Sequence, residues 1–388
     1  MTALPNPEVT IVVVPRERFQ FAAESLESLY EATQCPFRLI YVDNNSPAKM
    51  RRYLAAQSQA RGFQVVRSDR YLSPNAARNF GLQYVTSRYV VFVDNDVIFA
   101  PGWLQALVNC AQETQATVVG SLVCQYRPVH HTIHCAGGEY MAAADRERFE
   151  QSPSPDTEPV GWTIAEQTHH QNRPVSEVKA QLHRQPTGFV EFHAMLVSMA
   201  FFQQHGPLDE GFCCTKEYLD FAMRVTRAGG TIYLEPASIV TFLTHPPAPR
   251  LQWADLPYFA LRWSDVWEGH SLRYFQQKWN LASSRYFQKR YKKLGWRRWE
   301  ELIQPRMDAF SWLGPERAKQ VSKRLTTWEK WLNRSWCDRY TRRVAQKLEC
   351  DPAAIALGQN YPPVSLAVQS PAAQPRASTA PDALAVNR

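Results

Sequence analysis

The sequence predicts an α/β protein with a mixed, mostly parallel sheet, helices on both faces of that sheet, and a helical, basic C-terminal extension. Three observations support this fold class. Short runs rich in valine and isoleucine alternate with helical stretches along the first 113 residues, which is the pattern of a parallel sheet. The runs are continuously apolar, as in strands buried on both faces. From about residue 250, tryptophan and arginine become frequent and the apolar spacing becomes helical.

The strands and helices of the first half are expected at short intervals. Strands are predicted, because β-branched residues gather there, over 9–15, 37–46, 63–68 and 88–94. Helices are predicted over 18–33, 49–60, 72–86 and 101–113. The third helix carries a start signal, since Ser73 can cap it and Pro74 occupies its first position.

The second half is less regular. Residues 125–185 are rich in His, Pro, Gln and Arg and are expected to form an irregular insert. Within 216–242, a helix is expected to end near Gly229 and Gly230 and a strand to follow. The tail is rich in Pro, Ala and Ser and lacks apolar area, so it is expected to be disordered. The chain therefore divides into an α/β domain, a helical extension and a tail, over 1–250, 251–350 and 351–388.

No segment of the sequence marks the chain for a membrane span or for secretion. The longest apolar run, residues 192–202, is shorter than the ~20 residues that a membrane-spanning helix needs, and it contains His193. The N-terminus has no basic segment followed by an apolar one, so no secretory signal is visible. Eight cysteines are scattered without a C-x-x-C pair, which favours free thiols over a disulfide framework. The expected location is the cytoplasm.

The positive charge of the chain is concentrated in one segment. Residues 281–350 contain 18 Lys and Arg against 7 Asp and Glu, interleaved with aromatic residues. For the Trp/Arg-rich segment 251–350 as a whole, three interpretations stay open, in order of preference: helices that pack their tryptophans on the first domain, a peripheral surface on the inner face of an anionic membrane, and stacking on nucleic acid. No nucleic-acid-binding motif is present, so nucleic acid is not an expected partner.

Carboxylates follow two of the predicted strands. Asp43 ends "IYVD" and Asp94 ends "VFVD", with Asp96 two residues later. Because open parallel sheets bind ligands at the carboxyl ends of their strands, these side chains are expected at the rim of one crevice. Asp94 and Asp96 would face one ligand if the chain stays extended there. Clustered carboxylates suit Mg²⁺ or Mn²⁺ bound with a diphosphate, although Asp and Asn also favour such positions as turn residues.

Five motifs in order resemble family 2 of the glycosyltransferases, inverting enzymes of the GT-A fold. They are "TIVVVP", "IYVDNNS", "SPNAARNFGLQYV", "VVFVDNDV" and "GPLDEGF…KEYLDFAMRVTRAGG", and they extend over about residues 8–245. The resemblance implies metal-dependent transfer of a sugar from a nucleoside-diphosphate sugar, such as a UDP-, GDP- or dTDP-sugar, to an acceptor hydroxyl. A glycan or a lipid-linked precursor is the expected acceptor.

The resemblance also implies roles for individual residues. Asp43 would contact the base of the nucleotide, Asp94 would lie near the ribose, and Asp96 would bind the Mn²⁺ or Mg²⁺ ion that bridges the two phosphates. Arg78 matches a position that often faces the nucleotide, and a solvated helix arginine is its alternative. His245 would complete the metal site, where an imidazole ligand favours Mn²⁺ over Mg²⁺, and a plain loop residue is its alternative.

Such an enzyme needs a base that takes the proton from the attacking hydroxyl. Glu217 and Asp220 in "KEYLDF" are the candidates, because they lie three residues apart on one face of a predicted helix. This chain has Tyr218 where the family often has a second acid. Glu217 is favoured, since Asp220 could pair with Arg224 instead. Transfer would be a single displacement with inversion.

Two other functions stay open. A nucleotidyltransferase also uses strand-end carboxylates and a metal, but the loop after the first strand, "VVVPRERF", lacks the glycine that such enzymes usually carry. A non-catalytic binding protein on a degenerate transferase fold would use the basic segment as its working surface. The stretch "HHTIHC" at 130–135 is not expected to bind structural zinc, because no second ligand pair follows at finger-like spacing. A role on the acceptor side of the site is its alternative.

Overall fold

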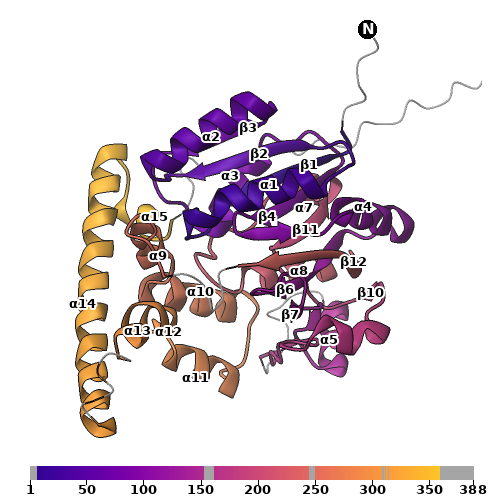
Figure 1. Cartoon of the computed structure of the whole chain (residues 1–388). Helices are drawn as coiled ribbons and strands as arrows, with labels where there is room; N and C mark the ends of the chain where they lie inside the picture. The colour runs from indigo at the N-terminus through magenta and orange to yellow at the C-terminus, as the bar shows by residue number, and fades with distance from the viewer. Residues whose placement is uncertain are drawn as a thin grey trace, which may run out of the picture.

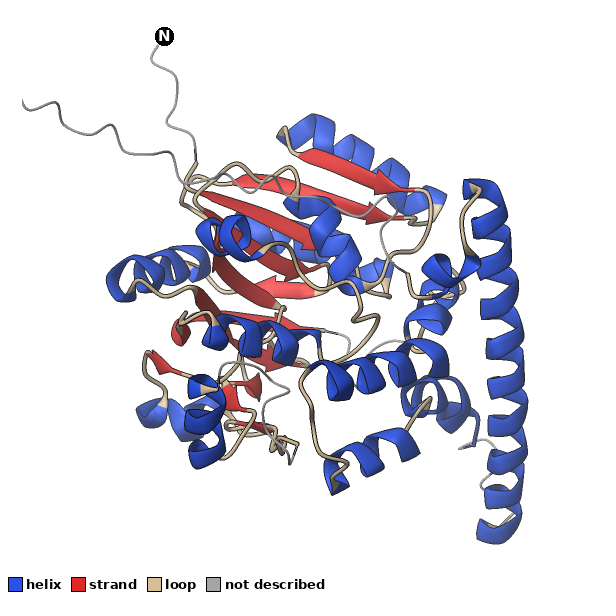
Figure 2. Ribbon diagram, turned by 180° about the vertical axis from the view of Figure 1, so that it is seen from behind, coloured by secondary structure: helices blue, strands red, loops and turns tan. Residues whose placement is uncertain are grey.

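The computed structural model describes residues 7–152, 161–243, 250–307, 310, 312 and 314–358. A ten-stranded sheet lies at the centre of the described chain. Helices surround this sheet, and a helical extension lies at one side of it (Figures 1 and 2).

The first half of the sheet is parallel. Strand β1 (Val9–Val14) pairs with β2 (Arg38–Asn44) on one side and with β4 (Tyr89–Asp94) on the other, and β2 pairs with β3 (Gln64–Ser68). The connections contain a 3₁₀ turn (Phe19–Phe21), α1 (Ala22–Ala32), α2 (Ala48–Arg61) and α3 (Pro74–Leu82). Ser73 caps α3 by accepting a hydrogen bond from the backbone N–H of Ala76, as its start signal predicts. The predicted strands and helices form here with small shifts at their ends.

The second half of the sheet is mixed. Strand β11 (Ala194–Ser198) runs antiparallel to β4 and to β6 (Val118–Gln125), and β12 (Ile232–Phe242) runs parallel to β6. Three short strands complete the sheet: β5 (Val97–Phe99), β7 (Thr132–Cys135) and β10 (Gln185–Pro186). The order along the main path is β10-β12-β6-β11-β4-β1-β2-β3. The predicted fold class, with its mixed and mostly parallel sheet, is confirmed.

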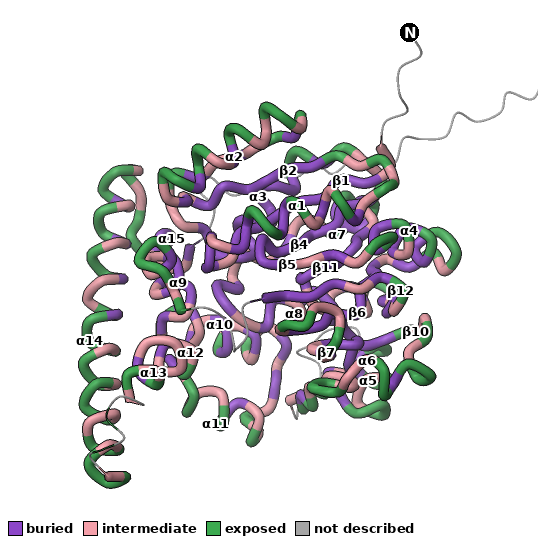
Figure 3. The backbone as a smooth tube through the Cα atoms, in the orientation of Figure 1, coloured by how far each residue is buried: buried purple, intermediate pink, exposed green. Residues whose placement is uncertain are grey.

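Both faces of the sheet are covered. Every residue of β1, β4 and β6 is buried, and alternate side chains of a strand point to opposite faces, so both faces must be packed. Figure 3 shows these buried strands inside a shell of partly exposed helices. Three further helices belong to this shell: α4 (Trp103–Thr114), α7 (Met199–His205) and α8 (Glu217–Arg227).

The predicted irregular insert contains more regular structure than expected. Besides β7, it contains β8 (Gly138–Glu139) and β9 (Gln167–Thr168), which form a separate two-stranded sheet. It also contains α5 (Ala143–Gln151), α6 (Val175–Val178) and a 3₁₀ turn (Lys179–Gln181). The strands are two residues long and the longest helix has nine, which is too short for a periodic apolar pattern to mark them in the sequence.

The extension is helical, as predicted. It comprises α9 (Leu256–Arg262), α10 (Asp265–Lys278), α11 (Arg285–Lys292), α12 (Trp296–Arg298), a π-helical turn (Trp299–Ile303), α13 (Gln304–Met307) and α14 (Pro315–Leu348). Helix α14 has 34 residues and runs along one side of the molecule (Figure 1). Its buried residues recur every four positions, at Asn333, Cys337, Thr341 and Ala345, so one narrow stripe contacts the rest of the protein.

The start of the tail is ordered, so the prediction of disorder is wrong there. Residues Pro352–Ala356 form helix α15. Trp267 Nε1 donates a hydrogen bond to the last carbonyl of this helix at 2.6 Å, and the backbone N–H of Ser73 donates one to Gly358 O at 2.7 Å. These tertiary contacts offset the entropy of ordering, which composition alone does not reveal. The rest of the predicted disordered tail, 359–388, lies outside the described residues.

Two predictions from composition can be compared with the structure. The described chain contains no helix that is both long enough and apolar enough to cross a bilayer. All eight cysteines are free, and six of them are buried, as expected of thiols outside a disulfide framework.

Replacing Gly81 with alanine tests the close packing of α3 on the sheet. A Cβ at this position would lie 2.5 Å from Val12 Cγ1 and 3.0 Å from Val42 Cγ2. Both valines are buried and stiff at χ1. We expect Gly81→Ala to lower the free energy of unfolding by about 1–3 kcal/mol, the range for overpacked cores, as measured by urea denaturation.

Gly269→Ala in α10 is the matched control. Its Cβ would approach only the flexible end of Arg273, at 3.2 Å, and Leu294 at 3.7 Å. Alanine favours a helix by about 1 kcal/mol over glycine, so the stability should stay unchanged or rise. An equal loss of stability in both variants would contradict the close-packing account.

Candidate functional site

A cavity of about 250 Å³ lies at the edge of the sheet where β1 and β4 end. Both the α/β domain and the extension contribute to it. Its lining residues are Arg16, Arg78, Asp94, His134, Glu191, Phe192, His193, Cys214, Thr215, Glu217, Tyr218, Phe242, Arg262, Trp263 and Arg297. Four arginines stand against three carboxylates, so the cavity can attract an anionic ligand.

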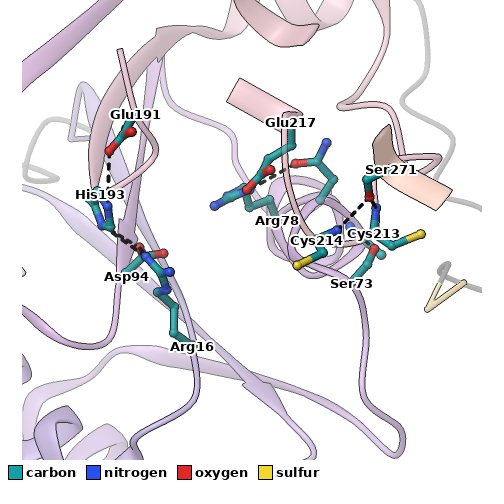
Figure 4. Close-up of polar contacts among 12 residues, drawn as sticks. Arg16, Ser73, Arg78, Asp94, Glu191, His193, Cys213, Cys214, Glu217 and Ser271 are labelled. Carbon is teal, nitrogen blue, oxygen red and sulfur yellow. Dashed lines mark hydrogen bonds and ion pairs between the residues drawn. The ribbon is translucent and has the colours of Figure 1, made fainter. Parts of the chain in front are cut away.

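Asp94, the last residue of β4, is buried in the wall of the cavity, where its carboxylate has two partners. Its Oδ2 accepts a hydrogen bond from Arg16 Nη1 at 3.1 Å and lies 2.9 Å from Nδ1 of His193 (Figure 4). Burial opposes its ionisation, but Arg16 and His193 outweigh burial and hold the pKa of Asp94 below its ordinary value. Burial also opposes protonation of His193, but Asp94 and Glu191 outweigh it and raise the pKa of His193 to about 9.

His193 forms a cluster with Glu191 and His134. The antiparallel register of β11 and β4 sets His193 beside Asp94. Glu191 Oε2 lies 2.9 Å from Nε2 of His134 and 3.4 Å from Nε2 of His193. One ligand atom from each of the three residues lies within 4.8 Å of the other two. Two imidazoles and a carboxylate at this spacing are a donor set that transition-metal ions accept.

Arg78 and Glu217 face the cavity from two helices. Arg78 is buried on α3, with its guanidinium 3.8 Å from the ring centre of Phe192, so it is not a solvated helix arginine. It forms an ion pair with Glu217 at 3.8 Å (Figure 4). Glu217 begins α8, and its Oε2 is buried without a hydrogen bond to any described residue. A buried carboxylate oxygen of this kind calls for a ligand or a water.

A buried ionic cluster around Glu166 holds the start of α8. Lys216 Nζ donates to Glu166 at 2.7 Å, and Tyr218 and Arg290 donate to the same carboxylate. Burial opposes ionisation of Glu166, but Lys216 and Arg290 lower its pKa to about 2. Lys216 adopts a left-handed conformation, with φ at 71°, directly before Glu217. The cluster therefore fixes the backbone from which Glu217 reaches the cavity.

Asp220, the other candidate base, lies outside the cavity lining. Its Oδ1 is 2.7 Å from Lys278 Nζ and accepts a hydrogen bond from Trp279 Nε1 at 2.8 Å. Burial raises its pKa, and Lys278 opposes the rise. The alternative pairing with Arg224 is not formed, because that guanidinium donates to two backbone carbonyls. Asp220 thus joins α8 to the end of α10, and only Glu217 reaches the cavity.

Asp43 lies at the end of β2 but does not line the cavity. Its carboxylate accepts a hydrogen bond from the backbone N–H of Ser46 at 2.8 Å and pairs with Arg67. The side chain is buried by these contacts. The strand-end position is as predicted, and the contact with a nucleotide base stays a prediction.

Asp96 does not face the same way as Asp94 through an extended chain, because residues 95–96 form a turn between β4 and β5. Asp96 is buried and lies outside the cavity lining. Its backbone carbonyl accepts a hydrogen bond from Leu243 N at 2.9 Å. His245, the other predicted metal ligand, lies outside the described residues.

The extension forms one side of the cavity. Arg262, at the end of α9, pairs with Glu17 at 2.9 Å, and Trp263 Nε1 donates to the same carboxylate at 2.8 Å. Burial opposes ionisation of Glu17, but Arg262 and Arg16 lower its pKa to about 2. Glu17 follows β1, so this buried pair joins the α/β domain to the extension beside the cavity.

The arginine wall consists of Arg16, Arg78, Arg262 and Arg297. Apart from Arg78, neither this wall nor the histidine cluster is marked by a motif in the sequence. Arg16, Arg262 and Arg297 stand in segments without a pattern that marks a site. Glu191 and His193 are two residues apart before an apolar strand, and this spacing was the one available signal. Their third partner comes from the stretch "HHTIHC", which shows no ligand spacing of its own.

Comparison with known proteins gives a family match and a structural likeness. Residues 10–155 match the model of Glycosyl transferase family 2. Among solved structures, the chain is similar to that of GalNAc-T7 with UDP, GalNAc and Mn²⁺, with a TM-score of 0.44 and 13% identity over 76% of this chain. The chain spans 58% of the length of the GalNAc-T7 chain. No curated protein matches it. The matched segment covers β1 to α5, and the family agrees with the predicted GT-A fold class.

Glu17→Gln tests the buried pair beside the cavity. We expect the free energy of unfolding to fall by about 3 kcal/mol at neutral pH, because Arg262 stays buried without a charge partner. The folded-state pKa of Glu17, about 2, lies below its ordinary value of 4.5, so the unfolded chain binds the proton more tightly. The stabilisation is present above pH 4.5 and is lost as the pH falls toward 2. In urea denaturation at a series of pH values, the gap between wild type and variant should shrink on acidification.

Glu27→Gln is the surface control. Glu27 pairs with Arg61, and its side chain is 53% exposed. We expect a change within about 0.5 kcal/mol, since exposed ion pairs contribute little. If Glu17→Gln lowers the free energy of unfolding by no more than Glu27→Gln does, the buried pair does not have the proposed role.

Proposed function

We propose that this protein is a glycosyltransferase that moves a sugar from a nucleoside-diphosphate sugar to an acceptor hydroxyl. The observation that carries the proposal is the cavity at the strand ends, which is lined by four arginines and by Glu217, whose Oε2 has no hydrogen bond from any described residue. Arginines of this kind attract a diphosphate, and the carboxylate can take the proton of the acceptor. The match of residues 10–155 to glycosyl transferase family 2 supports the same function.

The donor would bind with its diphosphate among the arginines. Arg16, Arg78 and Arg262 are each held by a carboxylate partner at the cavity. A guanidinium that is already oriented loses little side-chain entropy when it binds phosphate oxygens. Asp94 would accept hydrogen bonds from the ribose, and Asp43 would contact the base. UDP-, GDP- and dTDP-sugars are the candidate donors.

A divalent cation, Mn²⁺ or Mg²⁺, is the proposed cofactor. When bound, it would neutralise charge on the departing nucleoside diphosphate. The sequence predicts Asp96 and His245 as its ligands. That assignment rests on the family resemblance, because Asp96 lies outside the cavity lining and His245 outside the described residues.

The proposed transfer is a single displacement with inversion. Glu217 accepts the proton of the acceptor hydroxyl while the hydroxyl oxygen bonds to the anomeric carbon. The bond between that carbon and the diphosphate oxygen breaks in the same step, and the nucleoside diphosphate leaves toward the arginines. No covalent enzyme intermediate is required. The two alternatives predict other outcomes: a nucleotidyltransferase releases pyrophosphate, and a non-catalytic binding protein leaves the donor intact.

We also propose that α14 lies on an anionic membrane surface, with a glycan or lipid-linked precursor as the acceptor. The helix contains ten Lys or Arg and three acidic residues. Trp328, Trp331 and Leu332 are exposed by 68%, 65% and 50%. Exposed apolar side chains grouped on one helix mark an interaction surface. Tryptophan among basic residues suits the interface of an anionic bilayer, and the cytoplasmic face is the expected side.

Glu217→Gln tests the base. We expect UDP, GDP or dTDP to raise the Tm of wild type, by up to about 2.7 kcal/mol of stabilisation at a hundredfold excess over Kd, and to do so equally in the variant. Release of nucleoside diphosphate from the matching donor should fall by about a hundredfold or more, because the proton acceptor is lost. Thermal shift and a coupled diphosphate assay measure the two effects.

Glu113→Gln is the control, since Glu113 lies on the surface and its side chain is 64% exposed. It should retain both properties. The proposed function fails if no nucleoside diphosphate shifts the Tm with or without Mn²⁺, or if Glu217→Gln turns over the donor at the wild-type rate.

The double variant Trp328→Ala and Trp331→Ala tests the membrane surface. We expect wild type to co-sediment with vesicles that contain phosphatidylserine, less so at high salt, and not with neutral vesicles. The double variant should bind at least about tenfold more weakly, because it loses two apolar anchors. Tyr84→Ala, which removes an aromatic that is 41% exposed on the α/β domain, should bind like wild type. Equal binding to neutral and anionic vesicles would contradict this role.

A further inference from the structure

Three side chains in the cavity wall present one ligand atom each to a common point. Nε2 of His134 lies 2.9 Å from Glu191 Oε2, and Nε2 of His193 lies 3.4 Å from the same oxygen. The three atoms lie within 4.8 Å of one another. Asp96, one of the two ligands predicted from sequence, does not belong to this group, and His245, the other, lies outside the described residues.

The other nitrogen of each imidazole is already engaged by an oxygen. Nδ1 of His193 lies 2.9 Å from the Asp94 carboxylate, and Nδ1 of His134 lies 3.1 Å from the side-chain oxygen of Gln125. The Gln125 amide is oriented by its donation to Asn172 at 2.7 Å. Both oxygens are acceptors, so they favour a proton on Nδ1, and Nε2 of each ring, which is directed at Glu191, is the nitrogen that can bind a metal ion once it has released its proton. An oxygen behind a ligating histidine is the arrangement that metal sites use to orient imidazole.

The Glu191 carboxylate lies at the centre of the group, and its Oε2 lacks a hydrogen bond of good geometry. Glu191 Oε2 is buried and has no hydrogen bond of acceptable geometry from any described residue, although two imidazole nitrogens lie close to it. A buried carboxylate oxygen beside two imidazole nitrogens is compensated either by protons on those rings or by a cation between them. A metal ion satisfies all three atoms together, whereas a proton on one ring satisfies a single pair.

We propose that His134, Glu191 and His193 bind one divalent transition-metal ion in the wall of the cavity. Imidazole ligands favour ions such as Zn²⁺, Co²⁺ and Fe²⁺ and accept Mn²⁺, while Mg²⁺ and Ca²⁺ prefer oxygen alone. Three protein ligands leave coordination positions open, and all three residues line the cavity, so an oxygen of a bound ligand can reach the ion. Binding of the ion does not depend on the proposed transferase function; a contact between the ion and a donor diphosphate does.

Co²⁺ is the probe, because its visible absorption reports the ligands around it. The full-length protein is stripped with a chelator and titrated with Co²⁺. We expect one equivalent to bind, to be displaced by Zn²⁺, and to resist a thousandfold excess of Mg²⁺. His134→Ala and His193→Ala should each weaken Co²⁺ binding by at least a hundredfold, and Gln125→Ala by about tenfold through loss of orientation.

His131→Ala is the matched control, since His131 is an exposed histidine of the same stretch that lies outside the cluster. It should bind Co²⁺ like wild type. Asp96→Asn separates this site from the one predicted by sequence, because it should leave Co²⁺ binding unchanged. Circular dichroism and urea denaturation check that each variant is folded, and Glu191→Gln, which keeps the shape of the side chain, replaces any alanine variant that is not.

The proposal is overturned if Co²⁺ binds no more tightly than Mg²⁺, if folded His134→Ala and His193→Ala variants keep wild-type affinity, or if Asp96→Asn abolishes binding. The Tm shift by nucleoside diphosphates tests the proposed function separately. If the protein binds Co²⁺ through the cluster but binds no nucleoside diphosphate, the metal site is supported and the proposed transferase function is contradicted.

Discussion

The burial of Asp94 at the end of a central strand is the constraint on which the site depends. A carboxylate removed from water must be paired, and Arg16 and His193 provide that pairing. These partners come from the segment after β1 and the segment before β11, so compensation of one charge sets the geometry between three neighbouring strands. Because His193 is held by Asp94 through one nitrogen, its other nitrogen faces Glu191. The same buried charge therefore organises both the arginine wall and the histidine cluster.

The extension belongs to the site rather than to a separate module. Arg262 of the extension forms an ion pair with Glu17 beside the cavity, and Lys278 of the extension forms one with Asp220 of α8. Buried ion pairs add little net stability compared with apolar packing, but loss of one partner leaves an uncompensated charge in the interior. Separation of the extension from the sheet is thus penalised at several points at once. A ligand that binds among these arginines would therefore contact both the α/β domain and the extension.

Of the site residues that local patterns in the sequence predict, some line the cavity and others lie outside its lining, for identifiable reasons. Asp94 and Glu217 stand where a strand ends and a helix begins, and both line the cavity. Asp96 does not share a face with Asp94, because the chain turns directly after β4 and removes the two-residue alternation behind that expectation; its role as a metal ligand stays a prediction. Asp220 lies on the expected face of α8, but its carboxylate is paired with Lys278, the last residue of α10, and with Trp279, which follows that helix. The turn is marked only by Asp and Asn, which favour turns as well as ligand sites, and the packing of α10 leaves no local mark in the sequence.

The sequence by itself determined the alternation of strands and helices through the first 113 residues, the start of α3 at Ser73 and Pro74, and the helical nature of the extension. These features follow from apolar periodicity and capping, which act over a few residues. Only the tertiary structure decided which partner each buried charge has. Glu17 and Arg262, for example, are 245 residues apart in the chain and 2.9 Å apart in the fold. The ordered structure of residues 351–358 was decided in the same way. Contacts with distant residues, not local composition, offset the conformational entropy that this segment loses.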